Sequence, residues 1–239
     1  MAPASLDRTS APDRIFSSTC AAILGGRYAP GEKLPTQRAL AEQFDVNMAT
    51  VREAVKKLEQ LRLIEVRHGD AMRVRDWRRH GSLDIVAHMV FRAGAFDAEV
   101  LGDVMEARRL LLTECARLAA ERATAEQAAR LAELADHLTS PGDDGAAQAV
   151  DFEFHEELVD ASGNLVFTLI VNSIRDMYLE NAGAFSALVG DRERLGALYV
   201  RVAAAIQSRD AGAAADAARE LAGFQERQML APFGEPAGA

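Results

Sequence analysis

Apolar residues in the first third of the chain recur with the spacing of amphipathic helices. Residues 37–44 predict a short helix with one apolar side, and a polar break at residues 45–47 ends it. The next helix reaches about residue 62 and has one continuous apolar face, formed by Val51, Ala54, Val55, Leu58 and Leu61. Thr36 and Asn47 are the predicted N-caps, because a side-chain oxygen at that position accepts a hydrogen bond from the first turn.

A β-hairpin is predicted directly after these two helices. Residues 63–67 and 71–75 alternate between apolar and polar side chains, which is the period of a strand, and residues 68–70 join them. A further helix, over residues 13–26, precedes the pair. The second helix has a basic outer face, with Arg52, Lys56 and Lys57 off its apolar stripe. Two helices at a tight turn followed by a hairpin indicate a winged helix-turn-helix that binds duplex DNA; the alternative is a corner of an ordinary helical bundle.

The remainder of the chain predicts helices and no strand. Their expected ranges are 82–94, 98–122, 124–138, 147–161, 164–184, 191–208 and 211–229. The fold class is therefore mostly α: an N-terminal winged helix-turn-helix followed by an all-α bundle of about seven helices. The expected limits are a flexible arm at 1–12, the winged domain at 13–76, a linker at 77–81, a helical domain at 82–230 and a disordered tail at 231–239.

The charge of the chain is unevenly distributed. A net charge of −9 taken alone argues against a nucleic-acid partner. Residues 1–79, however, carry a net charge of +4, and residues 80–239 carry −13. All three lysines (Lys33, Lys56 and Lys57) belong to the first block. A basic head on an acidic body fits phosphate contacts confined to one end of the chain.

Other features of the sequence favour the cytoplasm. Residues 1–14 contain Asp7 and Asp13 and lack the apolar core of a secretory signal. The longest apolar stretch, around residues 165–171, is too short to span a bilayer, so we expect no membrane association. Cys20 and Cys115 have no metal-binding spacing and suit a reducing compartment.

Residues 30–69, PGEKLPTQRALAEQFDVNMATVREAVKKLEQLRLIEVRHG, resemble the winged helix of GntR-type bacterial regulators. The resemblance implies that the operator is contacted by Arg38, Asn47, Met48, Thr50, Arg52, His68 and Gly69. Met48 stands where the family commonly has an arginine, and methionine cannot pair bidentately with guanine. We therefore expect a different base preference at the position that Met48 faces. Asp70 stands where lysine or glycine is usual and should weaken the wing contact modestly.

Three stretches of the helical region resemble the FadR subfamily of these regulators, whose effector domain, called FCD, is a helical bundle. Residues 105–122 are similar to a helix of that domain that carries Glu106 and Arg108 here, and residues 205–220 are similar to its closing pair of helices. Residues 151–164 are similar to a helix whose marked positions here are Asp151, Phe154, His155 and Leu158. The resemblance implies an effector pocket lined by Arg108, Asp151, His155, Tyr199 and Leu221.

Asp151 and His155 are the candidates for a metal site. They are four residues apart, so they share one helical face and could chelate a cation. Many relatives complete such a site with two histidines, and Tyr199 and Leu221 stand at those positions here. Because two ligands hold a divalent metal weakly, we expect no metal and no other cofactor. The other interpretation is that the pair bonds to itself or to a ligand. Arg108 is the candidate partner of an anionic effector, or of Glu106 or Asp151.

The resemblance implies a ligand-responsive regulator rather than an enzyme. We expect a homodimer on a pseudo-palindromic operator, acting as a repressor, in which the effector changes the spacing of the two DNA-binding heads. Loss of the two histidines makes the pocket more apolar, which favours a fatty acid or an acyl-CoA as effector. The alternatives are a small carboxylate, with or without a divalent metal, and, remotely, a helical metal-dependent enzyme whose N-terminal domain only docks.

Overall fold

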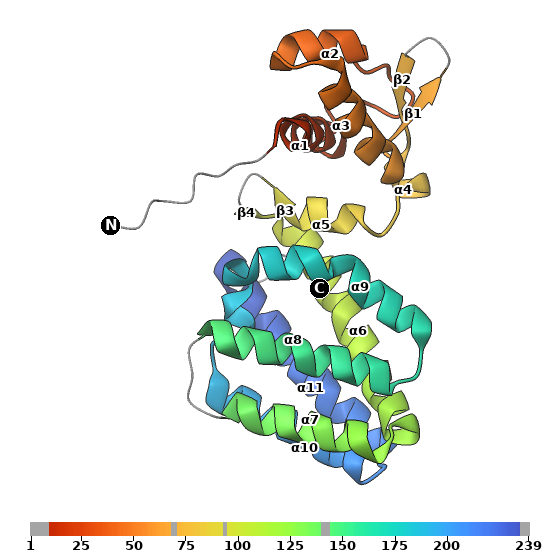
Figure 1. Ribbon diagram of the computed structural model, residues 1–239. Coiled ribbons are helices and arrows are strands. Elements are labelled where there is room, and N and C mark those ends of the chain that lie inside the picture. Colours follow the sequence, from red (N-terminus) through yellow and green to blue (C-terminus); the bar gives the residue numbers. More distant parts are fainter. Residues whose placement is uncertain (1–9, 68–70, 93–94, 140–143, 235–239) are drawn as a thin grey trace. The chain divides into compact units, whose positions relative to one another are not determined.

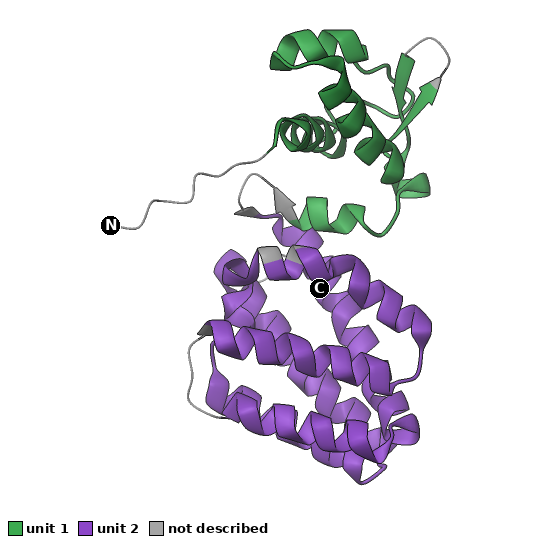
Figure 2. Cartoon of the chain, in the orientation of Figure 1, with its two compact units in different colours: residues 1–95 green, residues 96–239 purple. Residues whose placement is uncertain are grey.

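The computed structural model describes residues 10–67, 71–92, 95–139 and 144–234 (Figure 1). Contacts within the chain divide it into two units, residues 1–95 and residues 96–239 (Figure 2). In the described ranges the regular elements are helices and two short strand pairs, joined by turns. The predicted class, a winged helix-turn-helix followed by an all-helical region, is confirmed.

The first unit begins with three helices, α1 (Ala11–Leu24), α2 (Gln37–Phe44) and α3 (Met48–Gln60). The two predicted N-caps are present. The Thr36 hydroxyl accepts from the backbone N–H of Ala39 at 3.1 Å, and Asn47 Oδ1 accepts from the N–H of Thr50 at 3.0 Å. Asp45 ends α2 in the left-handed conformation, with φ of 51°, and so turns the chain sharply into α3.

The wing is an antiparallel hairpin of β1 (Ile64–Arg67) and β2 (Ala71–Val74), in which Ile64 pairs with Val74. A third segment extends it, because the Leu34 N–H donates to the Met72 carbonyl at 3.0 Å and an isolated bridge joins Lys33 to Arg73. Alternation places Met72 and Val74 in the core. The hairpin therefore packs as part of the domain instead of standing free.

One apolar core holds the first unit together. The predicted stripe of α3 is buried, with Val51 and Ala54 fully inaccessible, and it packs against α1 through Ile15 and Ile23. Lys57 adds an ion pair to this packing, because its Nζ lies 2.6 Å from Asp13 Oδ1 in α1. The side chain of Lys57 is thus directed to α1.

The residues expected to form a linker and the first bundle helix belong to the first unit. Residues 77–81 contain a short helix, α4 (Trp77–His80), and the expected helix 82–94 is reduced to α5 (Ile85–Val90). Ile85 is 5% exposed and packs in the same core as α1 and α3. The boundary between the units consequently follows Ala95 and not residue 81.

The expectation of no strand after residue 82 is wrong. Phe91–Arg92 (β3) pairs with Ala95–Phe96 (β4). Strands of two residues are too short for an alternating pattern to be visible in the sequence.

The second unit is built from six α-helices in its described residues, with bounds α6 (Ala98–Arg122), α7 (Ala125–Thr139), α8 (Asp144–Ala161), α9 (Leu165–Glu180), α10 (Arg192–Gln207) and α11 (Ala211–Leu230). The long helix α6 packs against α11 and α8, and α7 packs against α10 and α8 (Figure 1). Gly196 lets α10 approach α7 closely, since a Cβ there would lie 2.7 Å from Thr139 Cγ2.

Two segments of this unit differ from expectation. The helix predicted at 164–184 ends at Glu180, and a 3-10 helix, η1 (Ala182–Val189), follows it. The chain changes direction between α9 and η1, and this change places Phe185, Leu188 and Val189 in the interior. A straight continuation of α9 would direct these three side chains elsewhere. Residues 231–233, expected in a disordered tail, form the 3-10 turn η2 (Ala231–Phe233), where the Phe233 ring lies 6.4 Å from that of Phe96.

Among the residues described, none of the helices combines the length and the apolar character needed to cross a bilayer.

Candidate functional site

Arg38 and Arg52 project from the surface of the helix-turn-helix. Arg38 lies in α2 with its side chain 85% exposed, and its Nε is 3.2 Å from Glu42 Oε1 one turn later. Arg52 lies in α3 and is exposed, whereas its neighbour Val51 is buried. An exposed ion pair like that of Arg38 contributes little stability, so its guanidinium can exchange Glu42 for a phosphate at small cost.

Asn47 and Thr50 shape the N-terminus of α3. Asn47 is exposed, and its Oδ1 accepts from both the backbone N–H and the hydroxyl of Thr50, at 3.0 and 3.2 Å. Thr50 itself is half-buried. The cap aligns the first turn of α3, whose N–H groups and positive dipole end suit a phosphate or a base edge. Arg38, Asn47, Thr50 and Arg52 together are called the DNA-reading surface below.

The other residues predicted to contact DNA differ in their surroundings. Met48 is half-buried and packs against the core of the first unit, so part of its side chain faces inward. His68 and Gly69, predicted at the tip of the wing, lie outside the described residues, as does Asp70.

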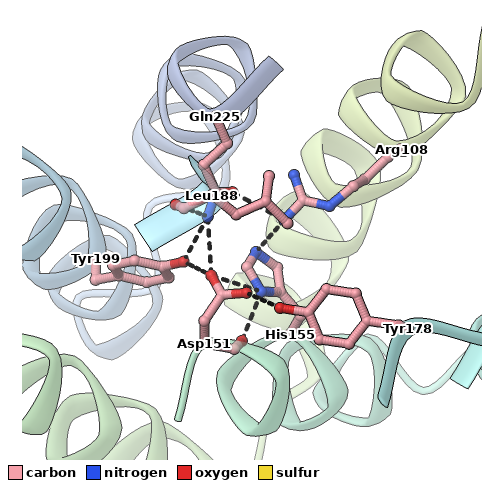
Figure 3. A network of polar contacts seen from close by, with 7 residues as sticks. All are labelled: Arg108, Asp151, His155, Tyr178, Leu188, Tyr199 and Gln225. Atoms are coloured by element: carbon pink, nitrogen blue, oxygen red, sulfur yellow. Dashed lines mark hydrogen bonds and ion pairs between the residues drawn. The ribbon is translucent and has the colours of Figure 1, made fainter. Parts of the chain in front are cut away.

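A polar cluster lies inside the second unit and brings together most of the predicted effector residues (Figure 3). Its members come from five different elements. They are Arg108 of α6, Asp151 and His155 of α8, Tyr178 of α9, Tyr199 of α10 and Gln225 of α11, called the Asp151 cluster below. All are buried except Arg108, which is half-buried.

The carboxylate of Asp151 is the centre of this cluster. Its Oδ1 accepts a hydrogen bond from the Tyr199 hydroxyl and another from Gln225 Nε2 at 2.8 Å. Its Oδ2 accepts from the Tyr178 hydroxyl at 3.4 Å. Burial, followed by the neighbouring Asp151 charge, holds the pKa of both tyrosines above the ordinary range. The phenols therefore stay protonated and act as donors, which is how a buried carboxylate is stabilised without solvent.

His155 is neutral in this environment. Burial lowers its pKa to about 4, against the opposing effect of nearby Asp151. An Arg108 Nη2 lies 3.0 Å from His155 Nε2, and a guanidinium can only donate. Nε2 must accordingly be the acceptor, which leaves the proton on Nδ1 for the backbone carbonyl of Asp151 at 2.7 Å. The imidazole is thus oriented by its own helix and presents its lone pair to Arg108.

Arg108 bonds to neither of the carboxylates that the sequence suggested as its partners. Its Nη2 donates to Gln225 Oε1 at 2.8 Å as well as to His155. Both acceptors are uncharged, so the positive charge of the guanidinium has no direct anionic partner in these two bonds. A half-buried guanidinium held by neutral acceptors is a site where an anion can bind.

Two members of the cluster were missed by sequence reasoning, and one predicted residue lies outside it. Tyr178 and Gln225 were not among the predicted effector residues, although Gln225 stands one helical turn after Leu221 and is fully buried. Leu221 is 2% exposed and belongs to the apolar core of the second unit, where it has no polar atom to offer. The prediction that Leu221 contacts the effector is not supported by any polar contact.

The donor set of the Asp151 cluster does not fit a metal ion. His155 directs Nε2 to a cation, Arg108, and its Nδ1 is protonated. Asp151 Oδ1 is already bonded by Tyr199 and Gln225. No group of three or more His, Cys, Asp or Glu side chains that could hold a metal occurs in the described residues. Asp151 and His155 act here as hydrogen-bonding partners of the cluster.

Two of the hollows on the surface of the second unit, among its described residues, lie away from this cluster. One of about 370 Å³ is lined by residues of α7 and α8, including Arg130 and Glu157, and one of about 30 Å³ by residues of α8 and α9, including Glu156 and Arg175. Neither hollow is lined by a member of the Asp151 cluster. The volumes of these hollows are therefore no guide to the Asp151 cluster, which has no member in either lining.

The sequence matches two protein families in the order of the two units. Residues 13–74 match the bacterial regulatory proteins of the gntR family, and residues 103–223 match the FCD domain. The HTH-type transcriptional regulator Mce2R of Mycobacterium tuberculosis is 34% identical, and the alignment covers 97% of this chain and 96% of that regulator. The HTH-type transcriptional regulator LutR of Bacillus subtilis is 31% identical over 66% of this chain and 71% of its own.

A solved structure shares the fold. It is described as "Lar controls the expression of the Listeria monocytogenes agr system and mediates virulence", and it superposes with a TM-score of 0.60. The match covers 93% of this chain and 97% of that chain at 14% identity. At this identity the likeness concerns the fold alone.

Proposed function

The chain belongs to the GntR family of bacterial regulatory proteins, and we propose that it acts as a homodimeric repressor that leaves its operator when an anionic effector binds. Family membership makes it a transcriptional regulator with an FCD effector domain, not an enzyme. The observation that carries the DNA-binding half of the proposal is the exposure of Arg38 and Arg52 beside the Asn47 cap of α3.

The DNA-reading surface is tested by duplex binding of an operator selected from random DNA. Replacing Arg52 with alanine should weaken binding roughly tenfold or more, because a bidentate arginine contact is worth about 1–3 kcal/mol. Arg117→Ala is the matched control, since Arg117 bonds to Glu114 and Glu121 in α6 and has the same charge. Binding should also fall steeply with salt, as counterion release requires. Equal losses for the two variants would contradict the assignment.

Met48 supports a more specific proposal about the operator. Its half-buried thioether can contact a thymine methyl group but cannot read guanine. Selected operators should consequently lack a guanine preference at the position facing Met48, and Met48→Arg should introduce one. A strong guanine preference of the unchanged protein at that position would refute this.

The effector half of the proposal rests on Arg108. Its half-buried guanidinium bonds only to neutral acceptors in the contacts described above, so an anionic group can join it without first breaking an ion pair. Arg108→Met should therefore abolish the response to the effector while leaving duplex binding in its absence intact. A variant that still responds would move the effector site elsewhere.

Two effector classes follow from different observations. Membership of the FadR subfamily would favour a fatty acid or an acyl-CoA, and the replacement of two polar positions by Tyr199 and Leu221 supports it. A small carboxylate is favoured by the close packing of this region, because Tyr199 and Leu221 are both buried within the core and the polar groups converge on Arg108. Thermal-shift titration with acyl-CoAs, fatty acids and small hydroxy acids separates these classes.

Homodimerisation and the sign of control need separate measurements. Two heads that read a pseudo-palindrome must be held at a fixed spacing, so an effector that changes this spacing lowers affinity. Light scattering of the protein alone and with duplex should give two chains per operator. A transcription assay should then show repression that the effector relieves; activation by the effector would reverse the sign proposed here.

A further inference from the structure

Gln225 is one of the two neutral acceptors that bond to Arg108. Its side-chain oxygen accepts from Arg108 Nη2 at 2.8 Å, the geometry that one oxygen of a bound carboxylate would adopt. The side chain is fully buried in α11, 117 positions away from Arg108 in the sequence. A neutral amide is a weaker partner for a guanidinium than a carboxylate is, because the latter bond is assisted by charge on both sides.

The other end of the same amide holds three further groups. Gln225 Nε2 lies 2.8 Å from Asp151 Oδ1, 2.9 Å from the Tyr199 hydroxyl and 3.2 Å from the carbonyl oxygen of Leu188 (Figure 3). An amide nitrogen has only two hydrogens, so these three acceptors share them. One side chain thus links α11 to α6, α8, α10 and η1.

We propose that Gln225 is a built-in substitute for the effector, and that a carboxylate ligand binds by displacing its amide from Arg108. This inference rests on the proposed anion site at Arg108 and specifies how that site works. The ligand's carboxylate replaces Gln225 Oε1, and the amide then leaves Asp151, Tyr199 and the Leu188 carbonyl together. No metal takes part in this exchange.

The remaining contacts make the exchange feasible. Asp151 keeps the hydroxyl donors of Tyr199 and Tyr178 when Gln225 leaves, so its buried charge is not left without partners. His155 keeps its Nδ1 bond to the Asp151 carbonyl and still presents Nε2 to Arg108. Among the groups that the Gln225 amide leaves, the Leu188 carbonyl of η1 loses the donor described for it, whereas Asp151 and the Tyr199 hydroxyl stay bonded to each other. Ligand binding is therefore transmitted to η1, which packs on α8 and α11.

The experiment compares carboxylate affinity in the full-length protein and two leucine variants. Acetate and octanoate serve as probes, because they present the same carboxylate with a short and a long chain. Gln225→Leu removes the competing amide and should bind at least one of them roughly tenfold more tightly than the unchanged protein does, since one hydrogen bond to a charged group no longer has to be broken. Gln148→Leu is the matched control. It removes another buried amide, which donates to the Ala182 carbonyl of η1, and should leave carboxylate affinity unchanged.

A second measurement does not depend on a folded variant. In protein with ¹⁵N-labelled glutamine side chains, saturation with the carboxylate that binds should shift the Gln225 amide resonances and leave those of Gln148 in place. Unchanged or weaker binding by Gln225→Leu, or an unshifted Gln225 amide in the saturated protein, would overturn the inference.

The possible failures are distinguishable. If the unchanged protein binds a carboxylate and Gln225→Leu binds it no more tightly, the displacement mechanism is wrong while the anion site stands. If neither protein binds either probe, the anion site and the displacement mechanism fail together, and duplex binding by the first unit is unaffected by that result.

Discussion

His155 shows how burial sets the protonation state and the partners of a residue that the sequence identifies only as a candidate site residue. Its spacing from Asp151 correctly predicts a shared helical face, and spacing alone is compatible with a chelating pair. The ring instead donates Nδ1–H to the carbonyl oxygen of Asp151 and accepts from Arg108 at Nε2. The partner of Nδ1 is thus set within α8, whereas the partner of Nε2 is set by the packing of α6 against α8.

The stability of the protein should depend on pH through this imidazole. The pKa of His155 is about 4 when folded and near 6.5 when exposed, so its contribution is complete above pH 6.5 and is lost as the pH falls toward 4. Over that range the free energy of unfolding should decrease by up to about 1.4 kcal/mol per pH unit. Urea denaturation of the unchanged protein and of His155→Gln measures this. Equal pH slopes in the two proteins would exclude His155 as the origin.

The two cysteines should be chemically inert in the folded protein. Cys20 and Cys115 are 3% and 0% exposed, and burial raises the pKa of each thiol to about 12. The reactive thiolate is therefore scarce and shielded at neutral pH. A colorimetric thiol assay should detect no rapid reaction until denaturant is added, and then two thiols per chain. Rapid labelling of the native protein would show that one of the cores opens readily.

At the scale of elements, helix α3 depends on its cap for both stability and orientation. Asn47 fixes the first turn through two bonds to Thr50 from the side of the helix that we propose faces DNA. Asn47 thus has two roles, capping α3 and, as we propose, contacting the operator. Two different substitutions can distinguish these roles.

Asn47→Ala should lower the free energy of unfolding by about 1 kcal/mol and weaken duplex binding. Asn47→Asp should restore the stability, because aspartate is an equally good N-cap, but should bind the duplex poorly since its carboxylate repels phosphate. Denaturation and anisotropy on the same samples test this. Full duplex affinity in Asn47→Asp would remove Asn47 from the DNA-reading surface.

Element boundaries were predictable where a local signal marks them. Thr36 and Asn47 begin helices where the sequence places them, and the strand period locates the wing. The unit to which residues 85–90 belong was not predictable. Tertiary packing decides whether Ile85 enters the core of the first or of the second unit. The 3-10 geometry of η1 is likewise decided by the burial of Phe185 and Leu188.

At the scale of the whole molecule, the two units carry separate tasks that must be coupled for regulation to occur. The basic residues concentrate in residues 1–79 and the acidic excess in residues 80–239. The effector site that we propose lies in the second unit and the DNA-reading surface in the first. Coupling between two sites is a free energy shared by both ligands, so it is reciprocal.

Reciprocity gives a test that needs no structural change to be observed. If a carboxylate effector weakens operator binding by a given factor, saturating operator should weaken effector binding by the same factor. Titration of each ligand in the absence and presence of the other measures the two factors. Gln225→Leu should change the two factors equally. Factors that differ would show that the two titrations do not report on the same oligomeric species.

The sequence by itself determined the helix-turn-helix with its two caps, the wing, the helical character of the second unit and the family. These properties depend on residues that are close together along the chain, because helical and strand periodicities are local patterns. Only the tertiary structure decided the partners of Asp151, which come from α9, α10 and α11. Arg108 and Gln225 are 117 positions apart, and no local pattern specifies which buried amide will meet which guanidinium. That pairing arises when the helices pack, because a buried polar group must find its partners within the core.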